Sequence, residues 1–332
     1  MHYPSSARRL LATALACAAL APAAFAQSQA DIANWPTKPL RIIVGFPGGS
    51  TPDLTARTIA EPLSRALGQP VIIENRVGAG GNIGGDLVAK ATDNHTIGVM
   101  IIGNMTIAKL LNPALPFDPI KDFAPISLIG TAPLVLAAPA NAPGNNATEF
   151  MAAARAAGDK WSYGTPGVGT VGHIGMELLK DKAGINPVHV PFPGNPQVIT
   201  SMISGDIQLS LLPPALVAAQ AKAGKLKVIG VTSTGRSTLA PEMPSLSEAG
   251  VKDFQMEIWN AAAAPASMPK PIVDKLSKLI SEIARSPEVR EKLFQQGWQV
   301  TGTSAEGLAR RIKADTEALG NVIRSRKIQA GS

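Results

Sequence analysis

One stretch near the start of the chain, residues 40–66, limits what this sequence can fold into. It opens with a β-branched run, Ile42, Ile43 and Val44, which is typical of a buried strand. The run breaks at residues 47–53, PGGSTPD, and apolar residues then recur at helical spacing. A strand, a glycine-rich loop and a helix in this order form the repeating unit of an α/β protein.

The start of this helix predicts a site for an anion. Thr51 fits the N-cap position, and Pro52 fits the first helical position, where a missing N–H group is tolerated. The first amides of a helix lack acceptors within it, and the positive end of the helix dipole points the same way. We therefore expect residues 46–53 to bind a negatively charged group, such as a carboxylate, through main-chain N–H groups.

Composition narrows the possible partners. The 332 residues have room for two domains, and 45% of them are hydrophobic, which is enough for a substantial core. Aromatic residues make up only 4%, and the Lys and Arg residues are scattered, so nucleic acid is not expected as a partner. The formal charge of +7 is compatible with attraction of anionic ligands.

The first 26 residues are predicted to form a signal peptide. Arg8 and Arg9 provide a positive segment, residues 10–20 are apolar, and the chain then reaches an Ala-Phe-Ala site with cleavage expected after Ala26. Arg8 and Arg9 could also indicate twin-arginine export, but the flanking residues do not support it, and a plain positive segment is favoured. Cys17 is the only cysteine, so no disulfide and no cysteine-based site is expected in the mature protein. We expect a periplasmic protein.

The rest of the chain predicts two α/β lobes joined by two crossing segments. Long apolar runs at residues 126–138 and 254–264 separate two series of alternating strands and helices. The expected lobes are residues 36–127 with 258–328, and residues 128–257. Ligands of such folds bind beyond the carboxyl ends of strands and between lobes. Residues 47–53 lie at one such end, and residues 103–106 are expected to form a loop at another.

A second glycine loop, residues 163–170, repeats the pattern of the first in the other lobe. Its sequence is YGTPGVGT, it follows a predicted strand, and Thr170 can cap the next helix. A binding role for the two loops together is favoured over two simple turns. Residues 78–84 are glycine-rich as well, but they lack the spacing of a dinucleotide-binding loop and are interpreted as a structural turn.

The sequence resembles the extracytoplasmic solute receptors of tripartite tricarboxylate transporters, the Bug or TctC family. The segments that carry the resemblance, in chain order, are WPTKPLRIIVGFPGGSTPDLTAR, IIENRVGAGGNIGGDLVAKA, FDPIKDFAPISLI, YGTPGVGTVGH, VHVPFPGN, AGKLKVIGVTS and MPSLSEAG. The resemblance implies a type II Venus-flytrap fold, no enzymatic activity, no cofactor, and delivery of ligand to the membrane permease subunits of such a transporter. It also implies that both glycine loops bind a ligand carboxylate through N–H groups, hydroxyls and bridging waters.

Two departures from the family pattern bear on the ligand. Pro52 stands where the family usually has a hydroxyl residue, and residues 192–195, FPGN, replace a common Tyr-Lys-Gly-Gly. Both changes suggest a less polar ligand body. The predicted ligand-binding residues are Phe46, Pro47, Gly48, Gly49, Ser50, Thr51, Asp53, Asn104, Met105, Thr165, Gly167, Val168, Gly169, Thr170, His173 and Pro213.

Several of these residues have a second interpretation. Asp53 either contacts a ligand cation or stabilises the helix start and pairs with Arg57. His173 either donates to a ligand or has a packing or capping role, and Phe46 and Met105 line the cleft or belong to the core. No metal-binding cluster is visible among the histidines.

Apart from Asp53, no acid in the predicted cleft could pair with an ammonium group, so we expect an alkyl or aromatic mono- or dicarboxylate. A receptor that presents its ligand to a sensor kinase, and an amino-acid receptor of the same family, remain alternatives. We expect a monomer.

Overall fold

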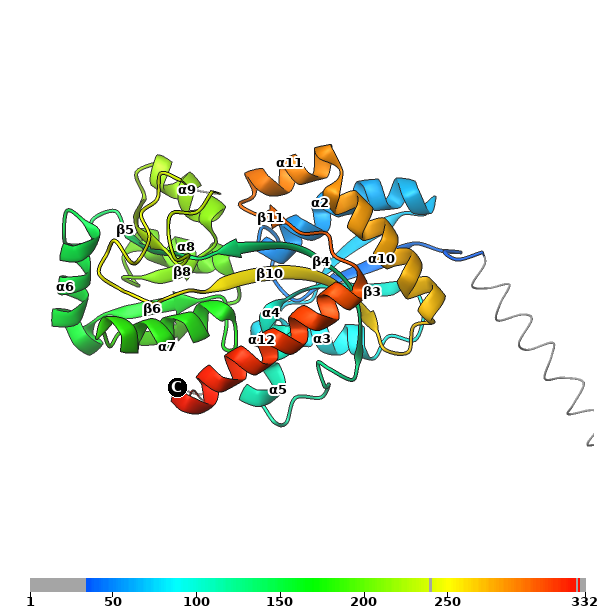
Figure 1. The fold of residues 1–332 in the computed structure, drawn as a ribbon, viewed down its shortest axis with the longest axis horizontal. Helices are drawn as coiled ribbons and strands as arrows, with labels where there is room; N and C mark the ends of the chain where they lie inside the picture. Colours follow the sequence, from blue (N-terminus) through cyan, green and yellow to red (C-terminus); the bar gives the residue numbers. More distant parts are fainter. Residues whose placement is uncertain (1–33, 239–240, 327, 329–332) are drawn as a thin grey trace, which may run out of the picture.

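The computed structural model describes residues 34–238, 241–326 and 328, and its strands fall into two groups (Figure 1). The predicted signal peptide lies outside the described residues. The first group is a six-stranded sheet in the order β11-β4-β10-β3-β1-β2. Its strands are β1 (Leu40–Val44), β2 (Val71–Asn75), β3 (Thr96–Ile101), β4 (Phe123–Pro133), β10 (Glu257–Pro265) and β11 (Gln299–Val300).

The second group consists of three strands in the order β8-β5-β9 and a parallel pair, β6 with β7. A bridge between Tyr163 and Leu209, and a 3.1 Å hydrogen bond from Gly164 N to Leu209 O, place β6 beside the residues that lead into β8. The spatial order is therefore β7-β6-β8-β5-β9. The strands are β5 (Val135–Pro139), β6 (Ser162–Thr165), β7 (Val188–Pro191), β8 (Ser210–Leu212) and β9 (Leu226–Val231).

The two groups share one topology. The order β2-β1-β3-β10-β4 in the first matches β7-β6-β8-β5-β9 in the second. The fourth strand of each order, β10 or β5, is antiparallel to both of its neighbours. Each of these strands arrives from the other group, because the chain passes from β4 to β5 and returns from β9 to β10 (Figure 1). This confirms the predicted two-lobed α/β fold with two crossings.

Helices cover both groups of strands. In the first lobe, Ile272, Leu276 and Ile280 of α10 are buried in one apolar cluster with Ile59 and Leu63 of α2 and with the sheet. The helices of this lobe are α2 (Thr51–Leu67), α3 (Asn82–Ala89), α4 (Ile102–Thr106), α5 (Ala108–Leu111), α10 (Lys270–Arg285), α11 (Pro287–Gln295) and α12 (Ala305–Arg326). Those of the second lobe are α6 (Ala147–Ala157), α7 (Val171–Ala183), α8 (Asn195–Ser204) and α9 (Pro214–Lys222).

The predicted start of the first helix is wrong by one residue. Ser50, not Thr51, is the N-cap of α2, and Pro52 therefore takes the second helical position. Ser50 has an extended backbone (φ −72°, ψ 160°), and its carbonyl oxygen accepts the first helical hydrogen bond from Leu54 N at 2.9 Å. A residue with this geometry is by definition the N-cap.

The expected loop at residues 103–106 is also wrong, because these residues belong to the one-turn helix α4. The Thr106 hydroxyl donates to Ile102 O at 2.7 Å, and Ile107 N donates to Gly103 O at 3.3 Å. All five residues of α4 are buried. Burial in the tertiary structure here outweighs the weak helix propensity of Gly103 and Asn104.

The predicted lobe bounds, at residues 127/128 and 257/258, remain a prediction. In the strand register, β4 pairs with β10 as far as Pro133 opposite Glu257, and β5 pairs with β8 and β9 from Val135 onwards. The first crossing therefore passes through Leu134.

We expect the Gly84→Ala substitution to destabilise the protein by about 1–3 kcal/mol. A Cβ atom on Gly84, in α3, would lie 2.7 Å from the Cα atom of Gly45, and main-chain atoms at such a position cannot move aside cheaply. Gly235→Ala is the control, since a Cβ atom there meets nothing within 4 Å. Urea unfolding measures both variants. Equal stability of the two would contradict the close packing of α3 on β1.

Candidate functional site

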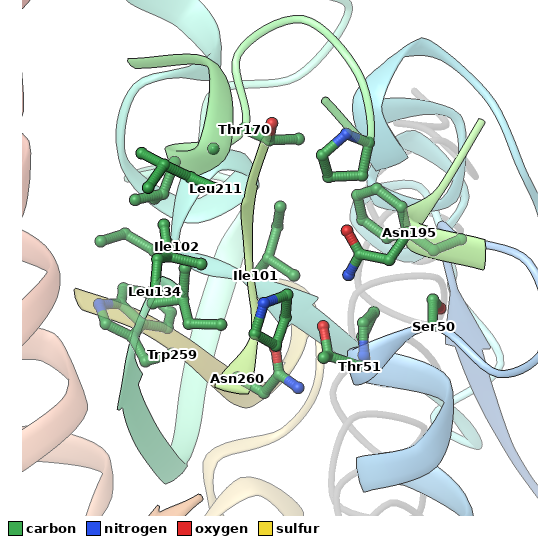
Figure 2. Close-up of a pocket in the computed structure, with 17 residues that line it drawn as sticks. Ser50, Thr51, Ile101, Ile102, Leu134, Thr170, Asn195, Leu211, Trp259 and Asn260 are labelled. Carbon is green, nitrogen blue, oxygen red and sulfur yellow. The ribbon is translucent and has the colours of Figure 1, made fainter. Parts of the chain in front are cut away.

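A small cavity of about 40 Å³ lies where the two lobes meet (Figure 2). It is bounded by the N-terminal ends of α2 and α7, the ends of β3 and β8, and the crossing segments. None of its lining side chains is charged. The lining residues are Phe46, Ser50, Thr51, Pro52, Ile101, Ile102, Leu134, Pro166, Thr170, Val171, Gly172, Asn195, Leu211, Pro213, Ile258, Trp259 and Asn260.

The N-terminal end of α2 brings an unmatched hydroxyl group to the cavity. Ser50 is only 1% exposed, and its Oγ has no hydrogen-bond partner, although this residue is the helix N-cap. The amides of Thr51 and Asp53 lie in the first helical turn, where the helix itself offers no acceptor. Buried polar atoms without a partner are rare in folded proteins, so this hydroxyl and these amides indicate a place for a polar ligand group.

Asp53 holds the first glycine loop in shape. Its carboxylate accepts hydrogen bonds from Gly49 N (2.9 Å), Arg57 Nε (3.0 Å) and Asn75 Nδ2 (2.9 Å). Burial alone would raise the pKa of Asp53, but the hydrogen bonds from Arg57, Asn75 and Gly49 outweigh it, so the pKa lies below its ordinary value. The predicted pairing of Asp53 with Arg57 is confirmed. Asp53 does not line the cavity.

The N-terminal end of α7 faces the same cavity from the second lobe. Thr170 is its N-cap, as predicted: the hydroxyl accepts from His173 N at 3.4 Å and donates to Gly167 O at 2.8 Å. The amides of Val171 and Gly172 follow this cap, and both residues line the cavity. Because a helix offers no acceptor to its first amides, Val171 and Gly172 present N–H donors opposite those of α2.

Two stacked histidines contact the second glycine loop. The ring centroids of His173 and His189 lie 4.3 Å apart, and both rings are nearly parallel. Gly169 N donates to His173 Nδ1 at 3.4 Å, and His189 Nε2 contacts Thr165 Oγ1 at 2.7 Å. Burial first, and the neighbouring His189 second, lower the pKa of His173 to about 4. His173 is therefore neutral at pH 7 and does not line the cavity.

The second glycine loop touches Gly80 and Gly103 of the first lobe beside the cavity. A Cβ atom on Gly167 would lie 2.9 Å from Gly80 Cα, and one on Gly103 would lie 2.5 Å from Gly169 O. Asn104 holds the loop around Gly80 through bonds from its Nδ2 to Gly80 O (2.9 Å) and Asn82 Oδ1 (2.8 Å). A wider groove of about 670 Å³ lies along these contacts.

The predicted ligand-binding residues are divided between these places. Those that line the cavity are Phe46, Ser50, Thr51, Thr170 and Pro213. Those that line the wider groove are Asn104, Gly167, Val168 and Gly169. Those that line neither are Pro47, Gly48, Gly49, Asp53, Met105, Thr165 and His173. Their role in binding stays a prediction.

Sequence reasoning missed the residues that the crossing segments bring to the cavity, among them Leu134, Trp259 and Asn260. The long apolar runs gave their approximate location but not their orientation. Asn195 also lines the cavity, and the departure from the family pattern at residues 192–195 was the available signal for it.

The sequence model described as "Tripartite tricarboxylate transporter family receptor" matches residues 55–328 of this chain. The chain belongs to this receptor family. Members of the family are periplasmic solute-binding receptors and not enzymes. The predicted family membership is thereby confirmed.

Solved structures of similar proteins agree with the receptor fold. Periplasmic binding protein BugD is 30% identical, with a TM-score of 0.84 and coverage of 89% of this chain and 99% of that chain. MatC of Rhodopseudomonas palustris, with bound malate, is 29% identical (TM-score 0.82, coverage 87% and 100%). Rpa4515 of R. palustris, with adipate, is 28% identical (TM-score 0.85, coverage 89% and 99%).

Two further findings concern the receptor's described residues. Among them, no helix combines the length and the apolar character that a bilayer crossing requires. Nor does this part of the chain bring together three or more His, Cys, Asp or Glu side chains that could hold a metal ion.

We expect His173 to make the receptor less stable in mild acid. The unfolded chain takes up a proton near the ordinary pKa of 6.5, whereas folded His173 does so only at about 4. The free energy of unfolding should therefore fall by roughly 1–3 kcal/mol between these pH values and level off below them. The ionisable groups near His173 are His189, Glu177 and Lys180.

The His173→Gln variant separates the contribution of the His173 ring to the pH dependence of stability from the contributions of His189, Glu177 and Lys180. Its amide oxygen can still accept from Gly169, but it takes up no proton in this range. Urea unfolding at pH 7, 6 and 5 should show a smaller loss of stability for the variant. An identical loss in both proteins would contradict the assignment.

Proposed function

We propose that this protein captures a small organic acid in the interlobe cavity and delivers it to the membrane subunits of a tripartite tricarboxylate transporter. The observation that most supports this proposal is that two helix N-termini, one from each lobe, meet at the cavity. The buried Ser50 hydroxyl at the cavity has no hydrogen-bond partner. Helix N-termini favour anions through their free N–H groups and their dipoles. Malate and adipate, the ligands named for two similar structures, support a carboxylate.

Main-chain donors are sufficient for useful affinity. A hydrogen bond to a charged group contributes about 1.5–3 kcal/mol net. Several such bonds, less the cost of ordering ligand and protein, reach the roughly −8 kcal/mol of micromolar binding. A lysine or arginine in the cavity is not required for this affinity.

The lining also argues against an amino acid as ligand. An ammonium group needs an acidic partner when it is buried, and no Asp or Glu is among the lining residues. Asp53 is close in sequence, but its carboxylate already accepts three hydrogen bonds. A thermal-shift screen of carboxylates and amino acids tests this point. Stabilisation by amino acids alone would contradict it.

A role in signalling is the alternative to transport, since a receptor of the same kind could present its ligand to a sensor kinase. Deletion of the gene distinguishes the two. Loss of cellular uptake of the bound acid supports transport. Unchanged uptake together with a lost transcriptional response would favour signalling.

We expect the Ser50→Ala variant to bind its best carboxylate about tenfold more weakly, a loss of about 1.4 kcal/mol. The substitution removes the unmatched hydroxyl but leaves the main-chain donors in place. Ser64→Ala is the matched control on the same helix, because the Ser64 hydroxyl donates to Gln69 O at 2.9 Å, at the far end of α2. Isothermal titration calorimetry measures both. Unchanged affinity for Ser50→Ala would remove the Ser50 hydroxyl from the site.

A further inference from the structure

The cavity has a polar and an apolar side. Figure 2 shows Ser50, Thr51 and Asn195 together on one side of it. The labelled residues on the opposite side are all hydrophobic: Ile102, Leu134, Leu211 and Trp259. These four residues are at most 3% exposed, so the part of a ligand that contacts them is desolvated.

Polar atoms of Trp259 and Leu134, on the apolar side, are already engaged within the protein. The indole N–H of Trp259 donates to Asp315 Oδ2 at 2.6 Å. Leu134 N donates to the Thr232 hydroxyl, and Thr232 N donates to Leu134 O, both at 2.8 Å. Leu211 lies within the paired register of β8 with β5. Trp259 and Leu134 therefore offer a ligand no ready hydrogen-bond donor.

Asn260 does not change this picture. It lines the cavity, but its amide nitrogen donates to the Thr55 hydroxyl at 2.9 Å. An Asn side chain has two donors, both on that nitrogen, and the bond to Thr55 holds the nitrogen beside α2.

We propose that the site is specific for ligands with a single carboxylate and a compact apolar body. The proposal rests on the proposed function and narrows it. One carboxylate is held by the N-terminal ends of α2 and α7, and the hydrocarbon end packs on the apolar side. A second carboxylate at that end would be buried against hydrocarbon side chains, which is strongly unfavourable. Malate and adipate are dicarboxylates, so this chain differs from the two relatives named with them.

Pairs of acids with equal chain length test the proposal. Butyrate and succinate differ only in the exchange of a terminal methyl group for a carboxylate, and so do hexanoate and adipate. We expect the purified protein to bind the monocarboxylate of at least one pair tenfold or more tightly than its partner, and neither diacid more tightly than its monoacid. Isothermal titration calorimetry at pH 7 and constant ionic strength gives the affinities.

A variant with a new cation provides the second test. Ile258 follows Glu257 on β10, is half-buried, and lines the cavity, so a lysine there can keep its ammonium group partly hydrated. Ile258→Lys should reduce the preference for butyrate over succinate at least fivefold. Val300→Lys is the control, because it makes the same charge change at a half-buried residue of the same sheet outside the cavity. Circular dichroism checks that both variants are folded.

The outcomes separate this inference from the proposed function. Equal or tighter binding of both diacids by the wild-type protein would overturn the single-carboxylate inference and leave the carboxylate receptor in place. If folded Ile258→Lys keeps the wild-type ratio of butyrate affinity to succinate affinity, the apolar lining of the cavity is not the cause of the preference for butyrate. Failure of every carboxylate to bind would overturn both.

Discussion

The candidate site depends on main-chain N–H groups that have no acceptor inside their own helices. The first turns of α2 and α7 meet at one cavity, one from each lobe, and no charged side chain lines it. Free amides and helix dipoles of this kind make a positive site without a positive side chain. Such a site holds an anion only when both lobes contribute, because each helix end alone supplies few donors.

The repeated strand order explains why these helix ends meet. In both lobes the second parallel strand of the order, β1 or β6, runs into a glycine loop and then into a helix. The exchanged strands β5 and β10 tie the lobes together beside these loops, and the two crossings bring Leu134 and Trp259 to the apolar side of the cavity. The contact of Gly80 with Gly167 allows the loop after β6 to approach the first lobe backbone to backbone. Side chains at these places would keep the lobes apart.

Much of this arrangement was predictable because short local sequence patterns determine it. The strand at residues 40–44, the glycine loops and the cap at Thr170 follow from β-branched runs, glycine and hydroxyl residues. Leu134 and Trp259 could not be assigned to the cavity, because they are 125 residues apart in sequence and meet only through the crossing strands. Likewise, the sequence did not indicate that the amide nitrogen of Asn104 holds Gly80 and Asn82, and the predicted ligand contact of Asn104 stays a prediction. Local sequence patterns thus predict where the loops lie. Tertiary packing determines which of their polar atoms have no partner within the protein.

A crystal structure of the protein with butyrate tests the central claim most directly. The account predicts the carboxylate between the first turns of α2 and α7, within hydrogen-bond distance of the Ser50 hydroxyl and of main-chain amides from both lobes. It predicts the terminal methyl group against Leu134 and Trp259. A carboxylate held by an arginine or lysine side chain, or bound in the wider groove beside Gly80, would contradict it.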